Sequence, residues 1–197
     1  TMMKIVVIGH GGHSKVIVDM ILSTGENDIV GFLDDKYKEE GLMAGTFYGP
    51  VTSFKGLVAK FPDIKFVIAI GDNKIRQSIV HKLNLSSENY VTVIHKSAII
   101  SPTSKIGHGA VIMPNSVINA DSRIGHHSII NTGSVIEHDS FIGDFSHVCP
   151  GVTLTGSVQI GEGAFIGSGS TIIPNIKIGE WSIIGAGATV ISDIPAY

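Results

Sequence analysis

The sequence predicts two domains: a small α/β domain over residues 1–93 and an all-β parallel β-helix over residues 94–197. Two observations predict this division. Up to about residue 93, short β-branched runs alternate with segments whose apolar residues have helical spacing. From Ile94 onward, an aliphatic residue occupies every sixth position without an insertion. The first pattern indicates strands joined by helices, and the second indicates short strands joined at regular corners.

Three apolar runs in the first domain have the character of buried strands. Residues 4–9 form a continuous, β-branched run that ends in glycine. Similar runs predict strands over residues 29–35 and 65–71. Apolar residues at helical spacing predict helices over residues 14–24 and 72–83. This alternation of strand and helix predicts a small parallel sheet.

The predicted strands end in residues that are suited to ligand binding. Gly9, the pair Asp34 and Asp35, and Gly71 follow the three strands. In parallel α/β sheets, ligands bind at the carboxyl ends of the strands. Residues 9–14 read Gly-His-Gly-Gly-His-Ser, a dinucleotide fingerprint with serine in place of its third glycine. Because a glycine-rich turn that enters a helix N-terminus binds anions, a diphosphate suits this turn.

The second half of the sequence has a strict period of six. A small residue usually follows four positions after each aliphatic residue, and glycine often follows directly. Neither a helix of period 3.6 nor a strand of period two produces this pattern. A hexapeptide β-helix does, because each short strand points one aliphatic residue inward and then turns a corner. Three hexads make one triangular coil, so the chain returns above itself every 18 residues. The aliphatic positions are 94, 100, 106, 112, 118, 124, 130, 136, 142, 148, 154, 160, 166, 172, 178, 184 and 190.

Composition restricts the environment and the partners. Apolar residues make up 43% of the chain and charged residues 16%, which argues against disorder. The formal net charge of -3 argues against nucleic acid or an anionic membrane as the main partner. No apolar run approaches the length of a membrane span, and no signal peptide is predicted. The single cysteine, Cys149, cannot form an internal disulfide, which fits a reducing cytoplasm.

Motifs along nearly the whole chain, in conserved order, resemble those of a known family. The chain resembles the left-handed β-helix hexapeptide acyltransferases, in particular the sugar acetyltransferases with a Rossmann-like domain ahead of the helix. That branch includes the N-acetyltransferases for UDP-4-amino-sugars on the route to diacetylbacillosamine and the sialic acid O-acetyltransferases. The matching segments are residues 9–15, 32–35, 68–73, 94–98, 131–132, 135–139 and 143–147.

The resemblance implies an activity and an assembly. It implies acetyl transfer from acetyl-CoA to the amine of a UDP-linked 4-amino-4,6-dideoxy sugar, for glycan or polysaccharide biosynthesis. It also implies a cytoplasmic homotrimer with active sites between subunits and no metal. The family usually continues into a tail with a Gly-Asn/Val-Pro-Ala motif, whereas the given sequence ends at Tyr197. Any contact of that tail with acetyl-CoA is therefore not carried over.

The candidate catalytic base is His138. Acetyl transfer needs a group that removes a proton from the nucleophile, and histidine has a pKa near working pH. His138 stands two positions past an inward aliphatic residue, so its side chain is expected to point outward. On the residues alone it also reads as a solvated corner histidine. The resemblance makes His138 the base and Asp139 the carboxylate that orients it, where some relatives have glutamate.

Further residues follow from the resemblance for the donor and the acceptor. His147 is implied to contact acetyl-CoA, the backbone near Ser168 and Ala186 to follow it, and the Gly156 amide to face the oxyanion. Without the resemblance, these glycines and small residues are interpreted as ordinary β-helix corners. The residues implied to bind the nucleotide-sugar acceptor are Gly11, Gly12, His13, Asp34, Asp35, Gly71 and Asn131.

Four other functions remain open at this stage. A sialic acid O-acetyltransferase would use the same fold and the same base. A zinc carbonic anhydrase uses three histidines at β-helix interfaces, but His126, His127, His138 and His147 do not have that spacing. A non-catalytic scaffold would use the β-helix only to trimerise. An NAD-dependent sugar dehydrogenase is disfavoured by the missing third glycine of the fingerprint.

Overall fold

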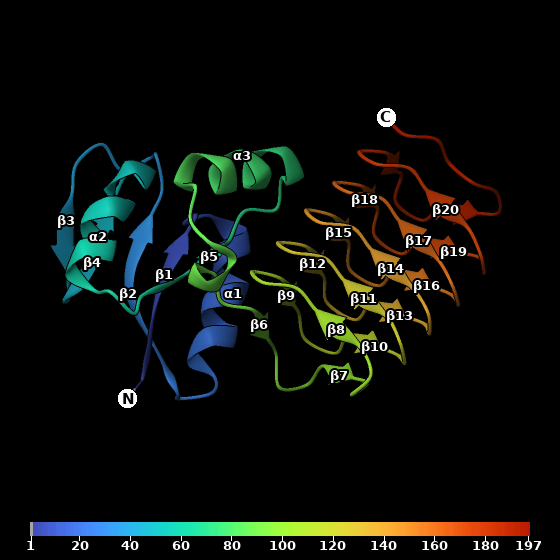
Figure 1. Ribbon diagram of the computed structural model, residues 1–197, viewed down its shortest axis with the longest axis horizontal. Helices are drawn as coiled ribbons and strands as arrows, with labels where there is room; N and C mark the ends of the chain where they lie inside the picture. The colour runs from blue at the N-terminus through green and yellow to red at the C-terminus, as the bar shows by residue number, and fades with distance from the viewer. Residues whose placement is uncertain (1) are drawn as a thin grey trace.

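The computed structural model describes residues 2–197 as an α/β domain followed by a long parallel β-helix (Figure 1). The α/β sheet has the strand order β3-β4-β2-β1-β5 and is parallel except for the β3–β4 pair. It carries helices on both faces, as in doubly wound folds. Its strands are β1 (Met3–Ile8), β2 (Asn27–Leu33), β3 (Gly41–Met43), β4 (Thr46–Gly49) and β5 (Lys65–Ile68). Its helices are α1 (Gly12–Leu22), η1 (Val51–Ser53), α2 (Phe54–Lys60), α3 (Asn73–Leu83) and η2 (Ser87–Asn89).

The three predicted strands and two predicted helices are present, with shifted ends. Helix α1 begins at Gly12, two residues before the predicted start, and Ser14 in its first turn donates its hydroxyl to the Gly11 carbonyl. It ends two residues early, at a turn closed by Gly25, whose φ is +69°. Strand β5 ends at Ile68, where its pairing with Ile8 of β1 ends. The predicted strand over residues 65–71 was therefore too long at its end.

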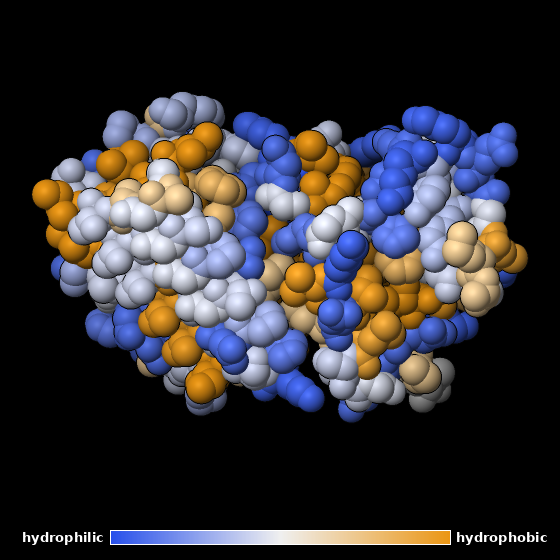
Figure 2. Space-filling view, turned by 180° about the vertical axis from the view of Figure 1, so that it is seen from behind, coloured by the Kyte–Doolittle hydropathy of each residue, from blue (hydrophilic) through white to orange (hydrophobic). Residues whose placement is uncertain are grey.

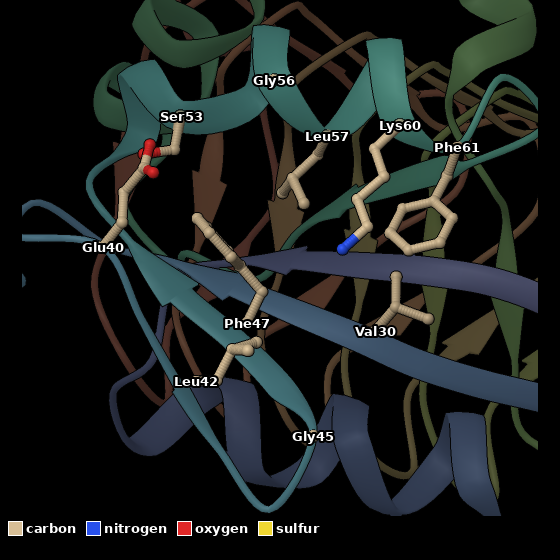
Figure 3. Close-up of a pocket in the computed structure, with 10 residues that line it drawn as sticks. All are labelled: Val30, Glu40, Leu42, Gly45, Phe47, Ser53, Gly56, Leu57, Lys60 and Phe61. Carbon is tan, nitrogen blue, oxygen red and sulfur yellow. The ribbon is translucent and has the colours of Figure 1, made fainter.

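The β3–β4 hairpin and helix α2 were not predicted from the sequence. The hairpin turns at Ala44 and Gly45, which both have positive φ, and it extends the edge of the sheet. Helix α2 covers the hairpin and leaves a cavity of about 300 Å³ between them (Figure 3). Lys60 points into this space beside Phe47 and Val30. None of the predicted site residues lines this cavity.

The second half is a left-handed β-helix of two-residue strands that stack in three parallel sheets. Each strand pairs with the strand 18 residues away, for example Val135 with Val117 and Thr153. We call the three sheets face 1, face 2 and face 3. Face 1 contains β6 (Val93–Ile94), β9 (Val111–Ile112), β12 (Ile129–Ile130), β15 (His147–Val148), β18 (Phe165–Ile166) and β21 (Ile183–Ile184). Face 2 contains β7 (Ile99–Ile100), β10 (Val117–Ile118), β13 (Val135–Ile136), β16 (Thr153–Leu154), β19 (Thr171–Ile172) and β22 (Thr189–Val190). Face 3 contains β8 (Lys105–Ile106), β11 (Arg123–Ile124), β14 (Phe141–Ile142), β17 (Gln159–Ile160) and β20 (Lys177–Ile178).

The predicted aliphatic ladders form the interior of this prism. From Ile112 to Val190, every sixth residue belongs to one buried cluster. Ile100 and Ile106 pack against that cluster and are partly buried. Ile94 was predicted to point inward but is 40% exposed, because it lies on the first coil and no coil lies beneath it. The hexad rule therefore holds except at the open end of the helix.

Serines at the corners remove the cost of burying their hydroxyl groups. Ser116 and Ser134 are fully buried, and their hydroxyls donate to the carbonyls of Asn131 and Cys149, each 15 residues further on. Ser146 and Ser170 repeat this bond. A buried hydroxyl without a partner would cost about 1–3 kcal/mol. In these hexads the buried serine therefore closes the corner and links it to the next coil.

The α/β domain packs against the first half of face 1. Helix α1 contacts β6, and outward residues Val111 and Ile129 share a buried cluster with Ile17 and Val67. Seen from behind, the centre of the β-helix surface is of intermediate hydropathy, and apolar residues gather along its edges (Figure 2). Within residues 2–197, no helix combines the length and the hydrophobicity needed to cross a membrane.

Candidate active site

His138 and Asp139 lie side by side on the corner between β13 of face 2 and β14 of face 3. The His138 Nδ1–H donates to Asp139 Oδ2 at 2.8 Å. Both side chains point outward, with 60% and 58% of their surfaces exposed. Asp139 has a φ of +59°, and this left-handed turn brings its carboxylate back to the ring. The contact assigns the proton to Nδ1, so the neutral ring presents an unprotonated Nε2.

Gly156 lies against the His138 ring in the next coil. A Cβ built on Gly156 would be 2.7 Å from His138 Nε2 and 2.8 Å from Cε1. The Gly156 carbonyl accepts a hydrogen bond from the Asn175 amide at 3.1 Å. Among the hydrogen bonds of residues 2–197, none is donated by the Gly156 amide. Glycine at this position therefore makes room for the imidazole and leaves an amide donor nearby.

His147 lies on β15 and is buried against the α/β domain. Its Nδ1–H donates to the Gly71 carbonyl at 3.2 Å, and its Nε2 accepts from the Asn131 side-chain amide at 3.0 Å. The Asn131 side-chain oxygen accepts from the Thr132 amide, which fixes the orientation of that side chain. Burial, and then the charge of Arg76, lowers the pKa of His147 to about 4. The ring is therefore neutral at pH 7, with its proton on Nδ1.

His13, in the first turn of α1, completes the group around His147. Its ring centre is 6.2 Å from that of His147. Its Nε2 is buried and has no hydrogen-bond partner within residues 2–197. Burial, followed by the charge of Arg76, lowers the pKa of His13 to about 4. A ring nitrogen without a partner in the protein is suited to forming a hydrogen bond with a bound ligand.

The glycine turn before α1 is open. A Cβ at Gly11 or Gly12 would meet no atom of residues 2–197 within 4 Å, so a ligand has room to approach the backbone. Gly9 differs, because its φ is +106° and a Cβ there would meet the Ala69 carbonyl at 2.7 Å. Gly9 thus keeps β1 and β5 close together, while Gly11 and Gly12 form the open turn at the N-terminus of α1.

Asp34 and Asp35 bind backbone amides at the end of β2. Asp34 accepts from the amides of His10 and Lys36, at 2.8 Å and 2.9 Å. Asp35 accepts from the Val51 amide at 3.0 Å. Both carboxylates therefore organise the loops at the carboxyl ends of β1 and β2, whatever else they bind.

An aromatic cluster beside these aspartates was missed by the sequence analysis. The His10 ring stacks on Phe32 at 4.2 Å and accepts or donates a hydrogen bond at 2.6 Å with the Tyr37 hydroxyl. Tyr48 of β4 stacks with Phe32 at 5.6 Å, and its ring centre is 5.7 Å from that of His10. His10 and Tyr37, which lie just past predicted strands, and Phe32, within a predicted strand, were the sequence signal. Tyr48 lies on a strand that was not predicted.

Ser168 and Ala186 lie one above the other on the corner between face 1 and face 2. Both are exposed, and the Ser168 carbonyl accepts from the amide of the next coil at Gly187, 2.8 Å away. This corner continues from Asn131 toward the C-terminal coils. It is separated from His138 by the whole of face 2.

The structure thus divides the predicted site residues between different corners of the prism. It brings together His13, Gly71, Asn131 and His147, which are far apart in the sequence. His138 and Gly156 lie on the corner opposite face 1, because the corner between faces 2 and 3 is opposite face 1 in a triangular coil. Within one chain, the candidate base is therefore remote from the carboxyl ends of the α/β strands, where Gly71 meets His147.

Among residues 2–197, no three histidine, cysteine, aspartate or glutamate side chains gather in a way that could hold a metal ion. His108 and His126 stack at 5.4 Å on the corner between faces 3 and 1, and His126 Nδ1 accepts from the His108 amide. These two histidines therefore stabilise this corner of the β-helix.

Acidification is expected to destabilise the fold through three buried histidines. Burial is the largest cause that lowers the pKa of His13, His127 and His147 from 6.5 to about 4. The three histidines therefore bind protons below about pH 6.5 in the unfolded chain, but only near pH 4 in the folded chain. The contribution of these histidines to the free energy of unfolding is fully present above pH 6.5 and is lost as the pH falls toward 4. We expect the thermal midpoint to fall by roughly 10–20 °C between pH 7.5 and pH 5.

Calorimetry at fixed protein concentration measures this dependence. His127→Phe is the matched variant, because His127 stacks on Phe145 and its buried Nδ1 has no partner within residues 2–197. That variant should lose part of the pH dependence. A midpoint that stays constant from pH 7.5 to pH 5 would contradict the proposed cause.

The fold and the site define a class: a hexapeptide-repeat transferase with an N-terminal α/β domain. Residues 4–83 match the family model of the PglD N-terminal domain, and residues 103–138 and 157–192 match bacterial transferase hexapeptide repeats. The chain belongs to the left-handed β-helix sugar acetyltransferases with a Rossmann-like N-terminal domain.

Individual relatives agree with this assignment. The chain is 43% identical over 112 residues to UDP-N-acetylbacillosamine N-acetyltransferase of Bacillus subtilis, a match that covers 57% of this chain and 52% of the relative. The matched region thus spans about half the length of that curated relative. The structure of PerB from Caulobacter crescentus, in complex with CoA and GDP-perosamine, has a TM-score of 0.89 and 35% identity, covering 100% of this chain and 93% of that chain. The acetyltransferase domain of PglB from Neisseria gonorrhoeae, in complex with acetyl coenzyme A, has a TM-score of 0.87 and 31% identity, covering 99% and 94%.

Proposed function

We propose that this protein transfers the acetyl group of acetyl-CoA to the amine of a nucleotide-linked 4-amino-4,6-dideoxy sugar, with UDP as the nucleotide, in glycan or polysaccharide biosynthesis. The observation that carries the proposal is the outward His138–Asp139 pair, whose Nε2 lies against Gly156. The names of the relatives support the same chemistry, since they describe N-acetyltransferases of amino sugars and complexes with CoA.

The proposed reaction follows from the geometry of this pair. The acceptor nitrogen attacks the thioester carbonyl, and His138 Nε2 takes the proton that the nitrogen loses. Asp139 stabilises the imidazolium that forms, through the 2.8 Å contact with Nδ1. The Gly156 amide stabilises the oxyanion of the tetrahedral intermediate. The tetrahedral intermediate then loses its C–S bond and keeps the new C–N bond, which becomes the amide. The proton passes from His138 to the leaving CoA thiolate.

We assign the acceptor to the carboxyl ends of the strands of the α/β domain, residues 1–93, and call this place the acceptor crevice. The diphosphate lies at the open turn of Gly11 and Gly12, at the N-terminus of α1. His13 Nε2, which is buried and unpaired, binds a polar group of the acceptor. The remaining acceptor residues are Asp34, Asp35, Gly71 and Asn131.

We assign the donor to the β-helix domain, residues 94–197. Acetyl-CoA follows the exposed corner at Ser168 and Ala186, and its reactive end lies near His147 and Gly156. His147 and Gly156 lie on different sides of the prism in one chain, so these contacts come from two subunits.

A homotrimer resolves this separation. The candidate base is on the corner opposite face 1, whereas the acceptor crevice adjoins face 1. A neighbouring subunit that places its His138 at the crevice would complete the site. We therefore propose three active sites between subunits of a cytoplasmic trimer, and sedimentation at several concentrations measures the assembly.

Thiol release tests the function. The protein is incubated with acetyl-CoA and one acceptor at a time: UDP-linked and GDP-linked 4-amino-4,6-dideoxy sugars, and sialic acid. We expect CoA release with a nucleotide-linked amino sugar, with a mass increase of one acetyl group in the product. Release with sialic acid alone would establish O-acetylation instead, and no release with any acceptor would contradict acetyl transfer.

A further inference from the structure

Arg76 of α3 is the most deeply buried charged side chain that the reaction scheme does not use. Only 1% of its surface is exposed. Within residues 2–197, its guanidinium forms no ion pair with a carboxylate. Its hydrogen bonds go to main-chain carbonyls and to the side-chain oxygen of Asn73. Burying a cation costs free energy unless its N–H groups are hydrogen-bonded, so this arrangement requires an explanation.

The carbonyls bound by Arg76 belong to both domains. On the α/β side, Nη1 donates to Ile70 and Gly71 at 2.9 Å and 3.2 Å. On the β-helix side, Nε donates to His127 at 2.7 Å and Nη2 donates to Phe145 at 2.9 Å. The rigid fork of one guanidinium therefore fixes the two domains to each other.

The contacted residues of the β-helix are equivalent positions in successive coils. His127, Phe145 and Gly163 are 18 residues apart, and all have positive φ, of 54°, 59° and 66°. Arg76 binds the first two carbonyls, and Asn73 Nδ2 binds the third at 3.0 Å. Asn73 is joined to Arg76 at 2.7 Å. Together the two side chains dock α3 on three consecutive turns of one corner.

This docking reaches the candidate site through Gly71. The Gly71 carbonyl accepts from Arg76 Nη1 and from His147 Nδ1, both at 3.2 Å. We infer that Arg76 is a positioning residue: by holding Gly71 against the β-helix, it sets His147 and the acceptor crevice in register. This inference rests on the proposed function for its kinetic consequence, but its structural consequence is independent of activity.

Arg76→Lys tests the inference, with Arg123→Lys as the matched control on the exposed face of β11. Lysine keeps the charge and loses the fork, so it cannot reach both domains. We expect the KM for the nucleotide sugar to rise about 10-fold or more, and to rise more than the KM for acetyl-CoA. Arg123→Lys should leave both constants within about twofold of the wild type.

Histidine NMR supplies a readout that does not need turnover. The charged or titratable groups facing His147 are Arg76 and His13, and burial by the docked domains is the main cause of its low pKa. In Arg76→Lys, the looser interface should admit water and raise the titration midpoint of His147 by about one pKa unit. In Arg123→Lys, the midpoint should match the wild type.

The results of these experiments distinguish the positioning role of Arg76 from the proposed function. A His147 midpoint that is unchanged in a folded Arg76→Lys protein would overturn the positioning role, whatever the activity. If Arg76→Lys does not fold, Asn73→Ala takes its place, because it removes one Arg76 acceptor and the Gly163 contact while keeping the guanidinium. The same shift of His147, of smaller size, is then expected, and its absence would overturn the inference. Wild-type protein that shows the NMR behaviour but no acetyl transfer would contradict only the proposed function.

Discussion

His138→Asn is expected to lower kcat for acetyl transfer by about 1,000-fold while leaving the fold intact. Proton removal by a positioned base contributes about 100- to 10,000-fold to such reactions. The side chain is 60% exposed and its hydrogen bond is to the neighbouring Asp139, so little packing is lost. Stopped-flow thiol release measures kcat, and calorimetry measures the thermal midpoint.

His108→Asn is the matched control for this prediction. His108 is an exposed histidine on another corner of the same β-helix, stacked on His126. It should retain wild-type kcat. If both variants kept wild-type kcat, His138 would be only a solvated corner residue.

Mixed trimers extend the test to the shared site. His138→Asn subunits retain the crevice with His147, and His147→Ala subunits retain the base. If sites combine residues from two subunits, trimers reassembled from both variants should regain part of the activity. Homogeneous trimers of either variant should remain impaired, and a mixture no more active than its parts would count against sites between subunits.

Gly156→Ala is expected to lower kcat by about 100-fold with only a small effect on stability. The added Cβ would lie 2.7 Å from His138 Nε2, closer than real Cβ contacts allow. The backbone of Gly156 is not in the left-handed region, so alanine is not strained there. Because the imidazole is exposed, it can swing away from the methyl group, and displacing a catalytic group by about 1 Å costs about 100-fold.

The control for this change is Gly56→Ala in helix α2. A Cβ at Gly56 meets no atom within 4 Å, and alanine favours the helix. This variant should keep full activity and gain slightly in stability. A crystal structure of Gly156→Ala should show the His138 ring moved from its contact with Asp139. Wild-type kcat in Gly156→Ala would show that the ring position seen here is not the reactive one.

The repeat in the sequence determined the β-helix almost residue by residue. Each hexad carries its own inward aliphatic residue and its own corner, so the local pattern and the final fold agree at every step. Ile94 departs from the pattern only because burial depends on a coil beneath it, which the local sequence does not encode. The α/β domain was predicted less completely. The β3–β4 hairpin is short, and its pattern has no long periodic run by which it could be recognised.

The candidate site shows the same division. Adjacent residues such as His138 and Asp139 could be paired from the sequence, because a one-residue separation on a tight turn leaves few alternatives. The contacts of His147 with Gly71, 76 residues away, and of Arg76 with Phe145, 69 residues away, could not. They depend on how α3 docks against the coils, and many docking positions satisfy the same local pattern.

The sequence by itself therefore determined the two folds, the outward direction of His138 and the open glycine turn before α1. Only the tertiary structure decided that His13, Gly71 and Asn131 gather around the buried His147, and that His138 lies on the opposite corner of the prism. The physical reason is range: repeats, turns and neighbouring pairs are governed by short-range geometry, whereas the register between two domains is fixed by a few buried hydrogen bonds, above all those of Arg76.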